Sequence, residues 1–328
     1  MDFDQLFSSF KDIKVAVIGD VMLDTYWWGK VDRISPEAPV PIVAVSKREE
    51  RIGGAGNVAL NIQALGASVS IISVVGKDTE AELLNGLLNN NNINTDHLIR
   101  STERITTNKI RIIGRNQQMM RLDAEITKPL SSADEQALLS AFENYAERER
   151  PSIVILEDYN KGVLTETVIE KIISICRAKN IFTAVDPKRK NFFAYRYVDI
   201  FKPNLHEAKE GLNIISDEVS DQSLKNIHAA LHEKLNHNIS LITLSEKGVF
   251  YQTNEDHLII PTHIRSIADV SGAGDTVIAV ASIVYAATKN VRLMAEMANI
   301  AGGLVCEEVG TVAIDKARLL EECKQLLK

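Results

Sequence analysis

The sequence predicts an α/β fold in which a largely parallel sheet is flanked by helices. Five short apolar runs have the length of buried strands, and the segments between them repeat apolar residues with helical spacing. Such alternation is typical of parallel sheets, because each crossover helix packs on a face of the sheet. The chain has 328 residues and is 45% hydrophobic. A large core is therefore expected, and length alone permits one large domain or two ordinary ones.

The expected elements follow one another regularly along the chain. The apolar runs place strands at 14–19, 69–75, 153–156, 181–185 and 239–244. Helical spacing places helices at about 55–65, 79–88, 133–145, 166–177 and 223–235. Three more helices are expected near 272–288, 291–307 and 314–327. The predicted sheet is therefore central, with helices on its faces.

Two stretches break this alternation. Residues 22–45 contain three consecutive aromatic side chains and then the proline-spaced segment 35–41, and residues 105–122 contain two β segments joined at 114–116. Prolines confine strands to sheet edges, and alternating cations in the second stretch indicate a half-exposed hairpin. We expect a small β lid formed by about 21–46 and 105–123. Exposed apolar lids often pair with a second copy, so a homodimer is expected.

Composition excludes several classes of protein. The net charge of −7 argues against nucleic acid as a main partner. No apolar run has the length of a membrane span, and the acidic, amphipathic N-terminus lacks a signal-peptide layout. Cys176, Cys306 and Cys323 are too few and too scattered for a disulfide framework or a zinc site. We therefore expect a protein of the reducing cytoplasm.

The most informative stretch is residues 269–276, where Gly272, Ala273 and Gly274 precede Asp275 and a long apolar segment. The pattern predicts a glycine turn that begins a buried helix, whose first N–H groups suit a phosphate. Asp275 has two interpretations. It is either an ordinary capping carboxylate or a base that removes a proton from a hydroxyl attacking the phosphate.

A second glycine cluster contains Gly53, Gly54, Gly56 and Asn57. Its spacing formally fits a dinucleotide fingerprint, but the charged residues 46–52 before it do not predict a buried strand. The remaining alternatives are a glycine turn that simply begins a helix and a site for substrate hydroxyls built from backbone and Asn57. Charge and spacing alone do not separate these two.

Other polar residues stand where ligands often bind. Asn204 and Glu207 fit a capping box, and they also fit a pair that holds a hydrated Mg²⁺ near phosphates. Residues 158–162 and 186–188 each follow a predicted strand, and ligands of open α/β sheets bind at these strand ends. Each is either a surface turn or part of such a site. No P-loop and no protein-kinase motif is present.

Taken together, these motifs resemble the PfkB/ribokinase family of carbohydrate kinases. Residues 53–66 resemble that family's first signature, 269–276 its second with Val270 in the threonine position, and 204–207 its magnesium motif. The match covers nearly the whole chain. It implies a ribokinase-like fold with a single kinase domain over 1–328, which uses ATP and Mg²⁺. A monovalent cation such as K⁺ is an optional further cofactor.

The resemblance also implies roles for the matched residues. Asp275 would be the general base, and the N–H groups of Gly272, Ala273 and Gly274 would form the anion hole for the transferring phosphoryl group. The residues that would bind the sugar are Asp24, Gly53, Gly54 and Asn57. Those that would serve Mg²⁺–ATP are Asn204, Glu207, Thr243, Ser245, Gly248 and Asn299, with Glu207 reaching the metal through water.

A narrower resemblance is to the bacterial D-glycero-β-D-manno-heptose 7-phosphate kinases, through residues 19–27, 33–41, 109–111, 116–118, 121–123 and 158–162. It implies phosphorylation of that sugar phosphate at O1, in ADP-heptose and lipopolysaccharide synthesis. The 7-phosphate needs cations, for which the candidates are Lys109, Arg111 and Lys161. Asn160 departs from the glycine that the subgroup tends to have. The alternative is another sugar or sugar-phosphate kinase of the family, ribokinase- or fructokinase-like.

In many members of this subgroup an adenylyltransferase domain follows the kinase. The present sequence contains no HxGH-type nucleotidyl-transfer motif. We therefore expect either a stand-alone kinase or the kinase half of a longer protein.

Overall fold

The computed structural model describes residues 2–114, 117–216, 218–263 and 265–327. Within them, a nine-stranded sheet has the order β13-β12-β11-β10-β9-β8-β1-β4-β5. The strands from β11 to β5 are parallel, whereas β12 and β13 are antiparallel additions at one edge. The bounds are β1 Lys14–Gly19, β4 Ser68–Gly76, β5 Asn94–Ser101, β8 Ile153–Glu157, β9 Phe182–Asp186, β10 Ile200–Phe201, β11 Ile239–Thr243, β12 Val249–Gln252 and β13 His257–Ile260.

Helices cover both faces of this sheet. Along β1, Val15 and Val17 belong to one apolar cluster while Ala16 and Ile18 belong to the other, as the two-residue period of a strand requires. The first cluster packs against α1 Phe3–Ser9, α2 Ala55–Ala64, α3 Thr79–Asn90, α8 Ala273–Thr288, α9 Val291–Val305 and α10 Lys316–Leu326. The second packs against α4 Ser132–Glu149, α5 Glu166–Lys179, α6 Leu205–Gly211 and α7 Asp221–Leu235.

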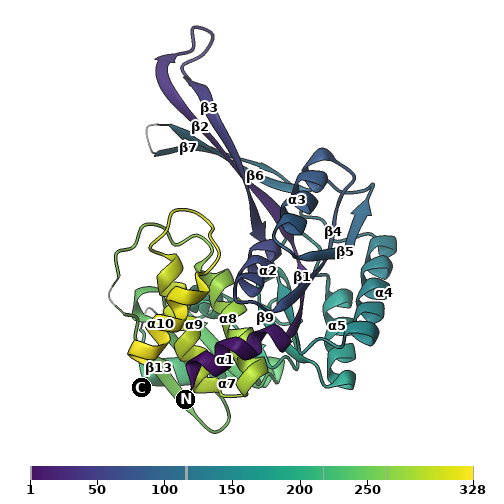
Figure 1. The fold of residues 1–328 in the computed structure, drawn as a ribbon, viewed down its shortest axis with the longest axis vertical. Coiled ribbons are helices and arrows are strands. Elements are labelled where there is room, and N and C mark those ends of the chain that lie inside the picture. Colours follow the sequence, from purple (N-terminus) through teal and green to yellow (C-terminus); the bar gives the residue numbers. More distant parts are fainter. Residues whose placement is uncertain (1, 115–116, 217, 264, 328) are drawn as a thin grey trace.

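A four-stranded sheet with the order β3-β2-β6-β7 forms the lid. Its strands are β2 Val21–Ile34, β3 Pro41–Gly54, β6 Thr107–Gly114 and β7 Gln117–Ala124. β2 and β3 form a long hairpin that extends far beyond the body (Figure 1). The lid reaches Gly54 rather than residue 46, because the charged segment 46–52 is a mostly exposed strand. The predicted joint between β6 and β7 includes residues 115–116, which lie outside the described residues.

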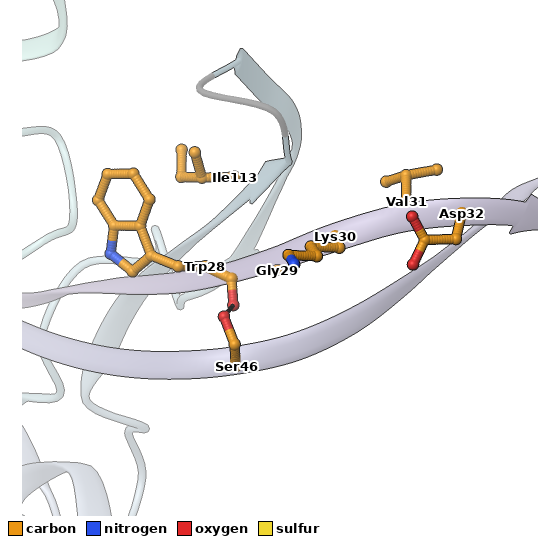
Figure 2. A pocket seen from close by; sticks show the side chains of 7 residues that line it. All are labelled: Trp28, Gly29, Lys30, Val31, Asp32, Ser46 and Ile113. Atoms are coloured by element: carbon orange, nitrogen blue, oxygen red, sulfur yellow. Dashed lines mark hydrogen bonds between the residues drawn. The ribbon is translucent and has the colours of Figure 1, made fainter.

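The outer part of the lid is hollowed on one side. A hollow of about 440 Å³ lies beside β2, and its lining includes Trp28, Ser46 and Ile113 (Figure 2). The Ser46 hydroxyl donates to the Trp28 carbonyl at 3.2 Å and so ties β3 to β2 there. The lid also exposes large apolar side chains, namely Ile34, Val40, Val45, Met119, Met120 and Leu122.

The predicted fold class, an α/β sheet flanked by helices with a small β lid, is confirmed. The five predicted strands and eight predicted helices have counterparts in the described residues, with ends that differ by a few residues. The strands of the central sheet that were not predicted are the edge strands β5 and β13, the adjacent β12 and the two-residue β10. β5 (NTDHLIRS), for example, has only two apolar residues, Leu98 and Ile99, and therefore no apolar run of strand length. Among the described residues, no helix combines the length and apolar character that crossing a bilayer requires.

Candidate active site

The glycine turn before α8 places Asp275 in the first turn of that helix. Gly272 is the N-cap with φ of 78°, and a Cβ there would lie 2.8 Å from Asn57 Nδ2. Glycine is therefore required both by the left-handed backbone and by the close approach of α2. The turn is held by Asp269, which accepts the N–H groups of Ser271 at 3.0 Å and Gly310 at 2.9 Å.

Asp275 is buried, and both of its oxygens accept hydrogen bonds. Asn57 Nδ2 donates to Oδ2 at 2.7 Å, and the Tyr159 hydroxyl donates to Oδ1 at 2.7 Å. Burial raises the pKa of Asp275 to about 6, although these two hydrogen bonds oppose the shift. A carboxylate with such a pKa is largely ionised at neutral pH and still accepts a proton readily, as a general base must.

The start of α8 is also suited to a phosphate. The helix dipole and the first N–H groups favour an anion there. Ala273 N–H already donates to the Val270 carbonyl at 3.3 Å, a long contact within the turn. A cation stands close by, because a Cβ on Gly274 would lie 3.7 Å from Nζ of the buried Lys202. Lys202, which the motif does not contain, thus lies beside the predicted anion hole.

Three buried carboxylates meet beside this turn. Oxygens of Glu157, Asp186 and Asp275 lie within 4.8 Å of one another, at the ends of β8 and β9 and the start of α8. Lys202 Nζ pairs with Asp186 at 2.7 Å. Both Glu157 oxygens are buried without a hydrogen-bond partner, and burial with the two neighbouring carboxylates raises the pKa of Glu157 well above its ordinary value. Unpartnered carboxylate oxygens fit a hydrated Mg²⁺.

The Asn204–Glu207 motif forms the capping box that the sequence permits. Asn204 Oδ1 accepts the Glu207 N–H and Glu207 Oε2 accepts the Asn204 N–H, both at 2.8 Å. The second Glu207 oxygen pairs with Lys188 Nζ at 2.5 Å. Lys188 also contacts Asp186 at 3.3 Å, so the motif and the carboxylates are connected. Capping is thus present, and a metal role for Glu207 stays a prediction.

The expected nucleotide edge follows β11. Thr243 ends this strand and pairs with Asn204 in a β-bridge. Ser245 and Gly248, with φ of 55° and 95°, bound the short turn before β12. A Cβ on Gly248 would lie 2.0 Å from the Ile260 carbonyl, and Asn299 Nδ2 donates to the Pro261 carbonyl at 2.9 Å. Gly248 and Asn299 therefore lie against the same short segment at the end of β13, residues 260–261.

The sugar-side residues lie where the lid meets the body. Gly54 is the N-cap of α2 with φ of 59°, and α2 directs the fully buried Asn57 toward Asp275. Asp24 on β2 faces Gly53 on β3, since a Cβ on Gly53 would lie 2.6 Å from Asp24 Oδ2. The lack of a side chain at Gly53 thus makes room for the Asp24 carboxylate.

The three predicted phosphate-binding cations differ in their partners. Arg111 is paired with Asp24, and Lys161 is paired with Glu125 at 2.7 Å. Lys109 has no carboxylate partner within salt-bridge distance among the described residues. Burial lowers the pKa of Lys109. The charge of Asp24 opposes this shift, and the nearby cations Lys161, Arg121 and Arg111 add to it. Lys109 is therefore the cation of the three that is free to meet an anionic group.

Five site residues were missing from the predicted set. They are Tyr159, Asp186, Lys188, Glu157 and Lys202. The first three lie in the strand-end segments that the sequence left open as surface turns or ligand sites, and the buried Asp186 shows that its segment is not a surface turn. Glu157 and Lys202 lie at strand ends as well, so the same rule could have found them.

Comparison with known sequences agrees with this geometry. Residues 12–317 match the pfkB family carbohydrate kinase. The chain is 40% identical to bifunctional protein HldE of Desulfatibacillum aliphaticivorans, over 95% of its own length and 63% of that protein. It is 41% identical to bifunctional protein HldE of Methylobacillus flagellatus over 94% of its length and 62% of that protein. The chain thus spans less than two thirds of these curated relatives.

Solved structures share the fold. Phosphofructokinase-2 from Escherichia coli in complex with potassium has a TM-score of 0.81 at 17% identity, covering 96% of this chain and all (100%) of that chain. Ribokinase from Arabidopsis thaliana complexed with ribose and ATP has a TM-score of 0.73 at 14% identity, covering 94% and 99%. The sequence match over residues 12–317 and the shared fold lead to one conclusion: the chain belongs to the pfkB family of carbohydrate kinases.

Proposed function

We propose that this kinase transfers the γ-phosphoryl group of ATP to O1 of D-glycero-β-D-manno-heptose 7-phosphate and forms the 1,7-bisphosphate. The observation that supports a kinase mechanism is the buried Asp275, held by Asn57 and Tyr159 at a helix N-terminus that suits a phosphate. The likeness to bifunctional protein HldE supports a heptose kinase role. ADP-heptose and lipopolysaccharide synthesis would be the pathway served.

The proposed step is an in-line transfer. Asp275 takes the proton of the acceptor hydroxyl. The hydroxyl oxygen forms a bond to the γ-phosphorus while the bond between that phosphorus and the ADP oxygen breaks. The N–H groups at 272–274 and the Lys202 ammonium would stabilise the charge on the transferring group. Asp24 and Asn57 would orient the sugar, and the turn at 243–248 with Asn299 would face the nucleotide.

Mg²⁺ would neutralise the ATP phosphates when bound. The residues that could hold it are Glu207 and the carboxylates Glu157 and Asp186. We expect Glu207→Gln to raise the Mg²⁺ concentration needed for half-maximal activity. Glu210 lies on the same helix and pairs with Arg189 instead of Lys188, so Glu210→Gln is the matched control. An unchanged Mg²⁺ titration would leave Glu207 as a helix cap. K⁺, which is bound in the E. coli phosphofructokinase-2 structure, is a second ion to titrate.

The acceptor is proposed from the lid. Lys109 lacks a carboxylate partner in the described part of the chain and would meet the 7-phosphate, whereas Arg111 would orient Asp24. A coupled ADP-release assay with heptose 7-phosphate, fructose 6-phosphate and ribose tests this choice. We expect the highest kcat/KM with heptose 7-phosphate. A preference for ribose, which has no phosphate, would contradict it and favour a ribokinase-like enzyme.

We also propose a homodimer formed through the lid. The exposed apolar side chains of β7, Met119, Met120 and Leu122, together with the hollow beside Trp28, would be covered by the lid of a second copy (Figure 2). Phosphofructokinase-2 from E. coli has been described in a tetrameric form, so assembly occurs on this fold.

A further inference from the structure

Tyr159 connects the candidate base with both sides of the site. Its hydroxyl donates to Asp275 Oδ1 at 2.7 Å. The base therefore receives one hydrogen bond from α2, through Asn57, and one from the segment after β8, through Tyr159. Tyr159 lies in the stretch 158–162 that carries the narrower resemblance, but it is not among the predicted site residues.

The backbone around Tyr159 is held in place by a buried carboxylate. Asp20, between β1 and β2, accepts the N–H groups of Tyr159 at 2.9 Å, Lys161 at 3.0 Å and Val163 at 3.1 Å. Asn160 has φ of 55°, a conformation that asparagine tolerates and glycine adopts freely, which explains the departure from glycine there. The contact between Tyr159 and Asp275 is thus part of a fixed arrangement.

The ring of Tyr159 lies under two ammonium groups. Lys109 Nζ on the lid is 5.3 Å from the ring centroid, and Lys188 Nζ on the body is 5.8 Å from it. Lys188 is the lysine that pairs with Glu207. One side chain therefore contacts the base, the unpaired lid cation and the cation beside the magnesium motif.

We propose that Tyr159 is a positioning residue, which holds Asp275 Oδ1 toward the acceptor hydroxyl and sets where Lys109 meets the anionic group of the substrate. This inference rests on the proposed function of Asp275 as the base. The Tyr159 hydroxyl donates its proton to the hydrogen bond with Asp275 Oδ1, so the proton of the acceptor passes to Asp275.

The hydroxyl and the ring have separable effects. Without the hydroxyl, the ionised form of Asp275 loses a donor, so the base becomes easier to protonate. Without the ring, Lys109 loses its support and binds the substrate's phosphate less well. We expect Tyr159→Phe to lower kcat about tenfold and to move the acid limb of kcat/KM upward by about one pH unit, with the KM for ATP unchanged. Tyr159→Leu should also raise the KM for the sugar phosphate.

Tyr195→Phe is the matched control. The Tyr195 hydroxyl donates to Asp158 Oδ2 at 2.7 Å. Tyr195 therefore supports the segment that contains Tyr159, without a described contact to Asp275. If Tyr195→Phe moves the acid limb as far as Tyr159→Phe does, Tyr159 acts only through the packing of its segment. The inference is also overturned if the acid limb of kcat/KM in Tyr159→Phe stays at the pH that it has in the parent.

A titration without substrate separates this inference from the proposed function. The Asp275 carboxyl is followed by NMR in protein with ¹³C-labelled aspartate, and its signal is identified by its absence in Asp275→Asn. The expected result is an upward shift of the midpoint in Tyr159→Phe and none in Tyr195→Phe, whatever sugar the enzyme accepts. Equal midpoints in the parent and in Tyr159→Phe would overturn the positioning role even if heptose 7-phosphate proves to be the substrate.

Discussion

The lid and the body contribute opposite kinds of charge to the site. The body places three buried carboxylates, Glu157, Asp186 and Asp275, around the start of α8 and balances them with Lys188 and Lys202. The lid contributes mainly cations, of which Lys109 is unpaired within the described chain and Arg111 is balanced by Asp24. The body residues are largely buried, whereas much of the lid is exposed.

This contrast suggests that the body carries out the chemical step and that the lid recognises the substrate. Buried carboxylates at a helix N-terminus suit proton removal and phosphate chemistry, because a low dielectric strengthens each interaction. An exposed sheet with a free cation suits recognition of a variable substrate. Changes in the body should therefore reduce kcat, and changes in the lid should mainly alter KM for the sugar phosphate.

The largest effect should come from the base. Asp275→Asn keeps the shape of the side chain but cannot accept the proton, so kcat should fall by about 10²–10⁴ while the affinity for ATP is retained. Steady-state kinetics and ATP binding by calorimetry measure the two quantities. Asp221→Asn, at the start of α7, removes a carboxylate that pairs with Lys225 outside the site and is the comparison. Near-parental activity of Asp275→Asn would end the assignment of the base.

The second effect tests the lid. Lys109→Met should raise the KM for the sugar phosphate roughly 10–100-fold, because a charge-assisted hydrogen bond to phosphate is lost, and should leave the KM for ATP unchanged. Lys47→Met is the control, since this exposed lysine pairs with Glu49 on the same sheet. Equal losses for sugar phosphate and ATP would indicate misfolding of the lid rather than a role in recognition.

The sequence predicted the body better than it predicted the site. Buried parallel strands are apolar runs, and glycine turns keep a fixed spacing, so the central strands, Asn57 and Asp275 could be located from short stretches. Tyr159 and Asp275 are 116 residues apart, and only the fold brings them together. Nor can a sequence show that Arg111 and Lys161 are paired while Lys109 is not, since pairing depends on the register of the lid strands.

The pH dependence tests the burial of the base. Because the pKa of Asp275 is raised to about 6, kcat/KM should fall about tenfold between neutral pH and pH 5. The pKa of Asp275 in the folded protein lies above the ordinary value of 3.8. Ionisation of this carboxyl therefore lowers the free energy of unfolding. The loss is complete above about pH 6 and absent below about pH 3.8. Asp275→Asn should therefore have a higher Tm than the parent at pH 7.5, and the difference should shrink toward pH 4.5. A constant difference would contradict a raised pKa.

The smallest effect on catalysis should come from the outer lid. Met120 is 55% exposed on β7, and Met120→Lys places a charge on the proposed dimer surface. We expect light scattering to show a shift from dimer to monomer, with kcat changed only a few-fold because the body residues stay in place. Leu326→Lys, at an exposed apolar position (40%) on α10, is the control and should leave the assembly unchanged. If Met120→Lys abolishes kcat while the monomer stays folded, the lid contributes to the chemical step itself, and the division between lid and body does not hold.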